Sequence, residues 1–173
     1  MSTKDDQPKS GRLSAAERRT AVIEAAVHEF ASSGLAAGST EAIAQRVGVS
    51  QPYLFKLFGT KKKLFLAAYE HVMQHVYAML EAAAEANPED PMGAMEKAYA
   101  QVLKRRDDQL LMLQAYAAAG DDEVRDHVRA HLRRVFAELI EMMGGDVAEA
   151  RSWYAQGLLD TLGAVLDLPE FIE

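Results

Sequence analysis

Apolar residues in this sequence recur three and four positions apart, which is the spacing of a helix face and not the alternation of a strand. The region around Ile23, Ala26, Val27 and Phe30 shows this most clearly, because these residues occupy the i, i+3, i+4 and i+7 positions of one helix face. Residue types with high helix propensity dominate the chain. No segment has the pattern of a convincing strand, so the sequence predicts an all-α fold.

Polar caps and helix breakers divide this pattern into separate helices. Ser14 and Glu17 form a capping box that opens the first helix, and Gly34 is expected to close it. The segment Asn87–Pro91 should end the long fourth helix. The predicted helices cover residues 14–34, 40–47, 51–57, 61 into the 80s, 91–106, 108–119, 121–143 and 146–167.

The last predicted helix favours burial on two sides. One side carries large residues, and the other carries small ones that let a second helix approach closely. The large stripe is Tyr154, Leu158, Leu162 and Val165, and the small stripe is Ala150, Gly157 and Ala164.

Residues 39–58 have the pattern of a tight helix-turn-helix. Ser39 or Thr40 can cap the first short helix. Gly48 can adopt the positive φ that ends this helix, and Ser50 can cap the next one. This arrangement is typical of proteins that place the second helix in the major groove of DNA.

The second short helix is expected to show a polar face to solvent, because Leu54, Leu57 and Phe58 form its inward set. The residues left for the outer face and the N-terminal turn are Gln51, Pro52, Tyr53 and Lys56. A Gln amide suits adenine, and a Lys can donate to guanine or phosphate. The following Thr60–Lys63 segment adds a hydroxyl, backbone N–H groups and charge suited to phosphate.

Charge is distributed unevenly along the chain, whose net charge is −7. Residues 1–65 contain ten Lys and Arg against six Asp and Glu, whereas the remainder contains nine against twenty. A basic end joined to an acidic body is the distribution expected of a small DNA-binding domain on a larger sensing or dimerising domain. Acidic surfaces that serve only solubility are the alternative reading of this asymmetry.

Cysteine is absent, so a disulfide framework, a thiolate nucleophile and Cys-ligated zinc are excluded. The first residues carry no apolar secretory segment, and no later stretch approaches a membrane span. We therefore expect a soluble cytoplasmic protein that does not involve a membrane.

The run from Ile23 to Tyr69 resembles the DNA-binding domain of the tetracycline-repressor (TetR) family over about a third of the chain. The residues that carry the resemblance are Ala25-Ala26, Phe30-Ala31, Gly34, Ile43-Ala44, Gly48-Val49-Ser50, Leu54-Phe55, Phe58, Lys61 and Leu64. The resemblance implies an N-terminal three-helix DNA-binding domain and a C-terminal helical domain that binds an effector and dimerises. The expected division is a flexible arm over 1–13, the DNA-binding domain over 14–62, and the effector-binding and dimerisation domain over 63–173.

The resemblance also implies which residues contact DNA and how the subunits associate. Carried over by position, the DNA contacts are Ser39, Thr40, Gln51, Pro52, Tyr53, Lys56 and Lys61. A homodimer joined through the helices at 121–143 and 146–167 would read palindromic double-stranded operator DNA. The chain departs from the family in two places, since Phe55 stands where a tyrosine is common and Thr40 stands where an apolar residue is common.

Beyond residue 70 the sequence offers candidates for a small-molecule pocket, because Met repacks easily and aromatic side chains combine an apolar body with a polar handle. The candidates are Met73, Tyr77, Met95, Tyr99, Met112, Tyr116, Trp153 and Tyr154. At helical spacing, each of them also fits an ordinary core. His71 and His75 are i, i+4 partners, but no further ligand pair completes a metal site, so hydrogen-bonded core or pocket histidines are expected.

These observations predict a sequence-specific transcriptional regulator, with repression relieved by a small molecule, no cofactor and no resident metal. An enzyme is disfavoured because no nucleophile–base set or phosphate loop is present, and Asp121-Asp122 fits a helix N-terminus better than catalysis. A dimeric ligand-binding module without strong DNA binding remains the alternative.

Overall fold

The computed structural model describes residues 14–172, so the arm expected over residues 1–13 lies outside the described residues. The described part is helical and contains no strand. Its elements are α1 (Ala15–Ala37), α2 (Thr40–Val47), α3 (Gln51–Phe58), α4 (Lys61–Ala86), α5 (Pro91–Val102), α6 (Arg106–Ala117), η1 (Ala118–Gly120), α7 (Asp122–Met142), α8 (Val147–Leu166) and η2 (Pro169–Phe171). The predicted all-α fold is confirmed.

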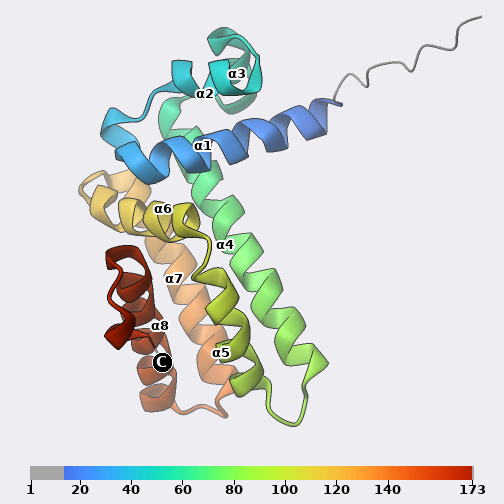
Figure 1. The fold of residues 1–173 in the computed structure, drawn as a ribbon, viewed down its shortest axis with the longest axis vertical. Coiled ribbons are helices and arrows are strands. Elements are labelled where there is room, and N and C mark those ends of the chain that lie inside the picture. The colour runs from blue at the N-terminus through green and yellow to red at the C-terminus, as the bar shows by residue number, and fades with distance from the viewer. Residues whose placement is uncertain (1–13, 173) are drawn as a thin grey trace, which may run out of the picture.

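The helices form a small upper unit on a longer lower bundle (Figure 1). Helices α2 and α3 lie at one end and α1 crosses beneath them. Helix α4 begins in the upper unit and runs to the opposite end of the molecule, where it turns back into α5. Helices α7 and α8 complete the lower bundle. No helix in the described range is long and apolar enough to cross a membrane.

The first helix begins as the capping box predicts, because the Ser14 backbone N–H donates to Glu17 Oε2 (2.7 Å) and the Glu17 N–H donates to Ser14 Oγ (3.1 Å). Gly34 adopts φ 68° and interrupts the helix, but one more turn continues to Ala37. A Cβ atom at Gly34 would lie 2.7 Å from Gln114 Oε1, so α1 and α6 meet closely at this glycine.

The junction between α5 and α6 lies earlier than the sequence predicts, by four residues at the end of α5 and by two at the start of α6. The expected helix over 91–106 ends at Val102, and the next begins at Arg106 and not at 108. Buried side chains fix this junction: Gln109 Nε2 donates to the Val102 carbonyl (3.1 Å), and Arg105 Nε donates to Asp108 Oδ2 (2.5 Å). These contacts satisfy backbone and side-chain groups that helical periodicity alone does not reveal.

Two hydrophobic clusters stabilise the fold. The upper cluster joins α1, α2 and α3 to the first half of α4 and continues into α6 and α7, with Phe30, Phe65 and Leu111 buried in it. The lower cluster, around Met95, Leu139 and Ala150, consists mainly of half-buried residues. The expected domain division at 62–63 falls in the first turn of α4, so the upper cluster extends across it.

Candidate nucleic-acid interface and ligand cavity

The α2–turn–α3 segment is fixed by local hydrogen bonds. Ser39 Oγ accepts from the Ala42 N–H (3.1 Å), and Ser50 Oγ accepts from the Tyr53 N–H (3.3 Å). Gly48 between the two helices adopts φ 71° and ψ 33°, a left-handed conformation in which glycine has no steric penalty. These contacts form the helix-turn-helix that the sequence predicts.

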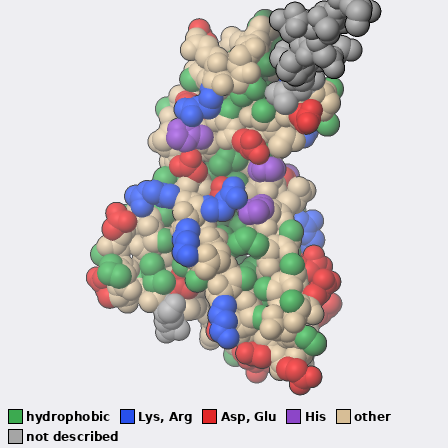
Figure 2. Space-filling view, turned by 45° about the vertical axis from the view of Figure 1, so that its right-hand side comes forward, with side chains coloured by type: hydrophobic (Ala, Val, Ile, Leu, Met, Phe, Trp, Pro, Cys, Tyr) green, Lys and Arg blue, Asp and Glu red, His purple; other side chains and the backbone are tan. Residues whose placement is uncertain are grey.

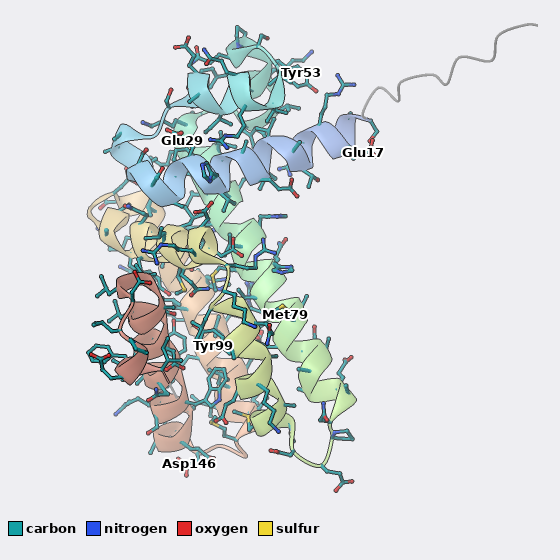
Figure 3. The ribbon with its side chains drawn as sticks, in the orientation of Figure 1. Glu17, Glu29, Tyr53, Met79, Tyr99 and Asp146 are labelled. Carbon is teal, nitrogen blue, oxygen red and sulfur yellow. The ribbon has the colours of Figure 1, made fainter. Side chains whose placement is uncertain are left out.

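The exposed face of α3 carries most of the side chains that the sequence assigns to DNA contact. Gln51, Pro52 and Lys56 are exposed, and Tyr53 is half-buried. Figure 3 shows Tyr53 at the end of the molecule opposite Asp146. Phe55 is 38% exposed and lies on α3 without a hydroxyl group.

Thr40 and Gln51 contact each other across the turn. Thr40 is 7% exposed, and its Oγ1 accepts a hydrogen bond from Gln51 Nε2 (2.7 Å). Ser39 is also tied to the rest of the domain, because its backbone N–H donates to Glu29 Oε1 (2.8 Å). The Thr40 hydroxyl therefore orients the Gln51 amide in the DNA-free protein, and this explains a polar residue where the TetR resemblance favours an apolar one.

The three lysines that open α4 have different partners. Lys61 Nζ donates to the carbonyl oxygens of Ala36 (2.8 Å) and Gly38 (3.0 Å) at the end of α1. Lys62 Nζ bridges to Asp121 (2.7 Å) and Glu123 (3.3 Å) at the start of α7, while Lys63 is exposed. Lys63 is therefore the lysine of this group that is most accessible to a phosphate. The sequence pattern does not distinguish it from the other two.

The Lys62 ammonium beside Asp121 lowers the pKa of that carboxyl below its ordinary value of 3.8. A lowered folded-state pKa stabilises the protein above the ordinary value, and this contribution is lost as the pH falls through the folded-state value. We expect Lys62→Met to lower the thermal midpoint at pH 7 and to leave it nearly unchanged near pH 2. Parallel melting curves across that pH range check this, with Lys97→Met on α5 as the control. Equal losses at both pH values would contradict it.

A cavity of about 640 Å³ lies in the lower bundle, between α4, α5, α6, α7 and α8. This volume lies within the roughly 300–1,000 Å³ that accommodates small-molecule ligands. The residues proposed from the sequence that line it are Met73, Tyr77, Met95, Tyr99, Met112, Trp153 and Tyr154. Tyr116 does not line the cavity. Its hydroxyl instead lies 3.4 Å from that of Tyr154, so it contacts the cavity wall from behind.

Gly157 of the small stripe of α8 meets Tyr99 of α5 at the cavity. The Tyr99 hydroxyl donates to the Gly157 carbonyl (3.1 Å) and lies 2.9 Å from Thr161 Oγ1. A Cβ atom at Gly157 would lie 3.6 Å from the Tyr99 ring, so the glycine allows this approach. Figure 3 shows Tyr99 in the interior of the lower bundle. Burial raises the pKa of Tyr99, which keeps its hydroxyl protonated as a donor.

Polar residues of the cavity were not identified from the sequence. Gln109, His131, Arg134 and Glu138 all line it. The spacing of the last three, at i, i+3 and i+7 along α7, places them on one face, but the same spacing is common on solvated helices. Only the packing of α4 against α7 turns this face inward.

The histidine pair lies outside this cavity. His75 is exposed, and its Nε2 lies 3.1 Å from Arg105 Nη1, whereas His71 is half-buried. His75 is therefore hydrogen-bonded as expected, but at the surface and not in the core.

Comparison with known proteins agrees with this geometry. The profile of the family described as "Bacterial regulatory proteins, tetR family" matches residues 22–68, which span most of α1, α2, α3 and the start of α4. Among solved structures, a TetR-like transcriptional regulator from Rhodococcus sp. RHA1 superposes with a TM-score of 0.71 at 20% identity, covering 94% of this chain and 90% of that one. The multidrug binding protein EbrR, solved with malachite green, superposes with a TM-score of 0.63 at 23% identity, covering 91% and 99%.

The superpositions extend over both the upper unit and the lower bundle, so the whole described fold is shared with these structures. Because the profile match falls on the helix-turn-helix itself, residues 22–68 are a DNA-binding domain of the type found in bacterial regulatory proteins of the tetR family.

Proposed function

We propose that the protein is a cytoplasmic repressor that leaves its operator when a small molecule fills the lower cavity. The observation that carries this proposal is the course of α4. Its first turn contacts the end of α1 through Lys61, and its second half lines the cavity with Tyr77 and Leu80. A ligand that binds better when α4 is displaced shifts the protein toward that state, and the recognition helices move with it.

Helix α6 and the α4–α7 contact offer a second connection between the two sites. Met112 on α6 lines the cavity, and Gln114 on the same helix packs against Gly34 of α1. Tyr69 of α4 is fully buried in the upper cluster, and its ring centroid lies 5.5 Å from that of the cavity residue His131. Helices α6 and α7 therefore each contact the cavity and the hydrophobic cluster of the upper unit.

Dimerisation is proposed to occur through α7 and α8. Leu159, Leu162 and Leu166 of α8 are 38%, 39% and 59% exposed in the single chain. They are spaced as one helix face, and apolar residues in such a row favour burial against a partner. A two-fold dimer would hold two α3 helices about 34–36 Å apart, which fits successive major grooves of a palindromic operator.

The proposed DNA contacts are the outer residues of α3 and two residues at the start of α2. They are Gln51, Pro52, Tyr53, Lys56, Ser39 and Thr40. Lys56→Ala should reduce the slope of log affinity against log salt by about 0.9 per lost phosphate contact, or about 1.8 for a dimer. The operator is first obtained by selecting random duplex DNA with the purified protein, and binding is then titrated with salt by fluorescence anisotropy. Lys104→Ala, an exposed lysine of the α5–α6 turn, serves as the control. An unchanged slope for Lys56→Ala would remove this residue from the interface.

A specific observation also supports the alternative of a ligand-binding module with weak DNA affinity. Lys61 and Lys62 have partners within the chain, and Phe55 lacks a hydroxyl group, so these three positions offer less to phosphate than the sequence pattern suggests. Failure of a folded dimer to enrich any DNA sequence would favour the module. Enrichment of a palindrome with a steep salt slope would exclude it. The dye bound by EbrR supports looking for effectors among ring compounds.

A further inference from the structure

We propose that the cavity binds a lipophilic ring compound that carries a hydrogen-bond acceptor, such as a carbonyl oxygen, and no negative charge. This inference rests on the proposed function, because it names the effector class of the same cavity. Two observations support it: two buried hydrogen-bond donors at the cavity lack acceptors among the described residues, and the charged residues that border the cavity are mainly acidic.

The walls of the cavity select an apolar body. Most of the lining is aliphatic, thioether or aromatic, and Tyr77, Tyr99, Trp153 and Tyr154 provide ring faces from α4, α5 and α8. Aromatic faces favour planar rings in offset or edge-to-face contact. A volume of about 640 Å³ admits a molecule of several fused rings.

His131 supplies the first free donor. It is 4% exposed, and its Nδ1 lies 3.2 Å from Arg134 Nη2. A guanidinium can only donate, so Nδ1 is the accepting nitrogen and the proton lies on Nε2. Burial lowers the pKa of His131, which keeps the ring neutral at pH 7. Nε2–H finds no acceptor among the described residues.

Trp153 supplies the second free donor. Its indole Nε1 is buried and also lacks an acceptor within residues 14–172. An indole N–H is a donor only, so a ligand can satisfy it solely with an acceptor atom. A buried donor without a partner destabilises the protein, and an acceptor-bearing ligand recovers this loss.

Several other polar groups at the cavity are already bonded within the chain. The Tyr99 hydroxyl bonds to Gly157 and Thr161, and Gln109 donates to the Val102 carbonyl while accepting from Thr161 Oγ1 (3.1 Å). Asp108 is bonded to Arg105. The open hydrogen-bonding capacity at His131 and Trp153 is therefore of the donor type.

The charges around the cavity disfavour an anion. Exposed carboxylates from α4 and α7 border it, and Arg134 is the cation that borders it among the described lining residues. The carboxylates are Glu81, Glu85, Glu138 and Glu141. Figure 2 shows several acidic side chains at the lower end of the molecule, away from α2 and α3. A cavity bordered by four exposed carboxylates and one guanidinium disfavours ligands with a negative charge.

Three probes with one ring frame separate these requirements: 9-fluorenone, fluorene and 9-fluorenone-4-carboxylate. Fluorenone has the carbonyl acceptor, fluorene lacks it, and the carboxylate adds a negative charge. Calorimetric titration of the full chain should show fluorenone binding at least about fivefold more tightly than fluorene, since a satisfied donor contributes about 1 kcal/mol. The carboxylate should bind at least about fivefold more weakly than fluorenone, by like-charge repulsion. The infrared ketone stretch should fall on binding, as it does when a carbonyl accepts a hydrogen bond.

Variants identify the donor. His131→Phe and Trp153→Phe each remove one N–H, and the one that fluorenone uses should weaken its binding about fivefold to tenfold. The same variant should return the ketone stretch toward its unbonded position and leave fluorene affinity within about twofold. Tyr53→Phe is the control, because it removes a hydroxyl from α3, outside the cavity. The comparison of the three probes on the unmodified protein needs no variant to fold.

Equal affinity for fluorenone and fluorene, tight binding of the carboxylate, or a ketone stretch unaffected by both substitutions would overturn the inference. Failure of all three probes to bind would overturn it as well. The proposed function fails separately, if the protein enriches no operator. A protein that binds its operator but none of the probes would therefore keep the regulator and lose the effector class.

Discussion

Leu162→Glu is expected to convert the protein to a monomer and to lower its operator affinity by more than about a hundredfold, since linking two binding modules raises affinity by about 10²–10⁴. The sequence predicts that the large stripe of α8 is buried, yet Leu162 is 39% exposed in the single chain. A partner helix that covers it would also bury a carboxylate at this position. Burying an unpaired charge in an apolar interface is strongly unfavourable.

Analytical ultracentrifugation and operator anisotropy on the same preparation check this expectation together. Ala100→Glu is the control, because it adds the same charge at an exposed position of α5, outside the proposed interface. Circular dichroism should show that both variants keep their helices. A dimeric Leu162→Glu protein with normal operator affinity would place the interface elsewhere.

Phe30→Ala is expected to lower the free energy of unfolding by about 3–5 kcal/mol, as removal of a buried aromatic ring usually does. Phe30 is fully buried in the upper cluster, and its ring meets that of Phe65 edge to face, with centroids 5.2 Å apart. The ring also lies under Gly38, where a Cβ atom would come within 2.5 Å of Phe30 Cδ1. The substitution therefore leaves a void between α1, α4 and the start of α2.

Urea unfolding followed by circular dichroism measures this loss. Phe55→Ala is the matched control, since it removes the same side chain from the exposed face of α3 in the same unit, and it should cost less than about 1 kcal/mol. Similar losses for the two variants would show that the upper cluster does not depend on Phe30. Because a loss of 3–5 kcal/mol is a large part of typical domain stability, operator binding should fail at 37 °C in Phe30→Ala.

The parts of the fold that were predicted well are those with local causes. The capping box at Ser14, the left-handed turn at Gly48 and the cap at Ser50 depend on residues three or four positions apart. The helix that begins after Asp121 was predicted for the same reason, since Asp121 Oδ1 accepts from the N–H groups of Glu123 and Val124. The α5–α6 junction was misplaced because Gln109 and Asp108 fix it through buried contacts.

At the candidate DNA interface, too, local features were predictable and distant contacts were not. The amphipathic pattern of α3 separates outward from inward residues, so the exposed positions of Gln51 and Lys56 follow from the sequence. The pattern does not show that Lys61 bonds to the end of α1 or that Lys62 reaches α7, because these partners lie 23–25 and about 60 residues away in the chain.

The all-helical fold, the helix-turn-helix and the residues on its outer face follow from local signals, because periodicity, caps and glycines act over a few residues. The tertiary structure alone decided which faces of α4, α5, α7 and α8 enclose the cavity, and that His131 and Trp153 are the groups left without acceptors in it. A helix face carries no record of what will pack against it. Whether a polar side chain there is solvated, paired or buried and free depends on helices that are distant in sequence.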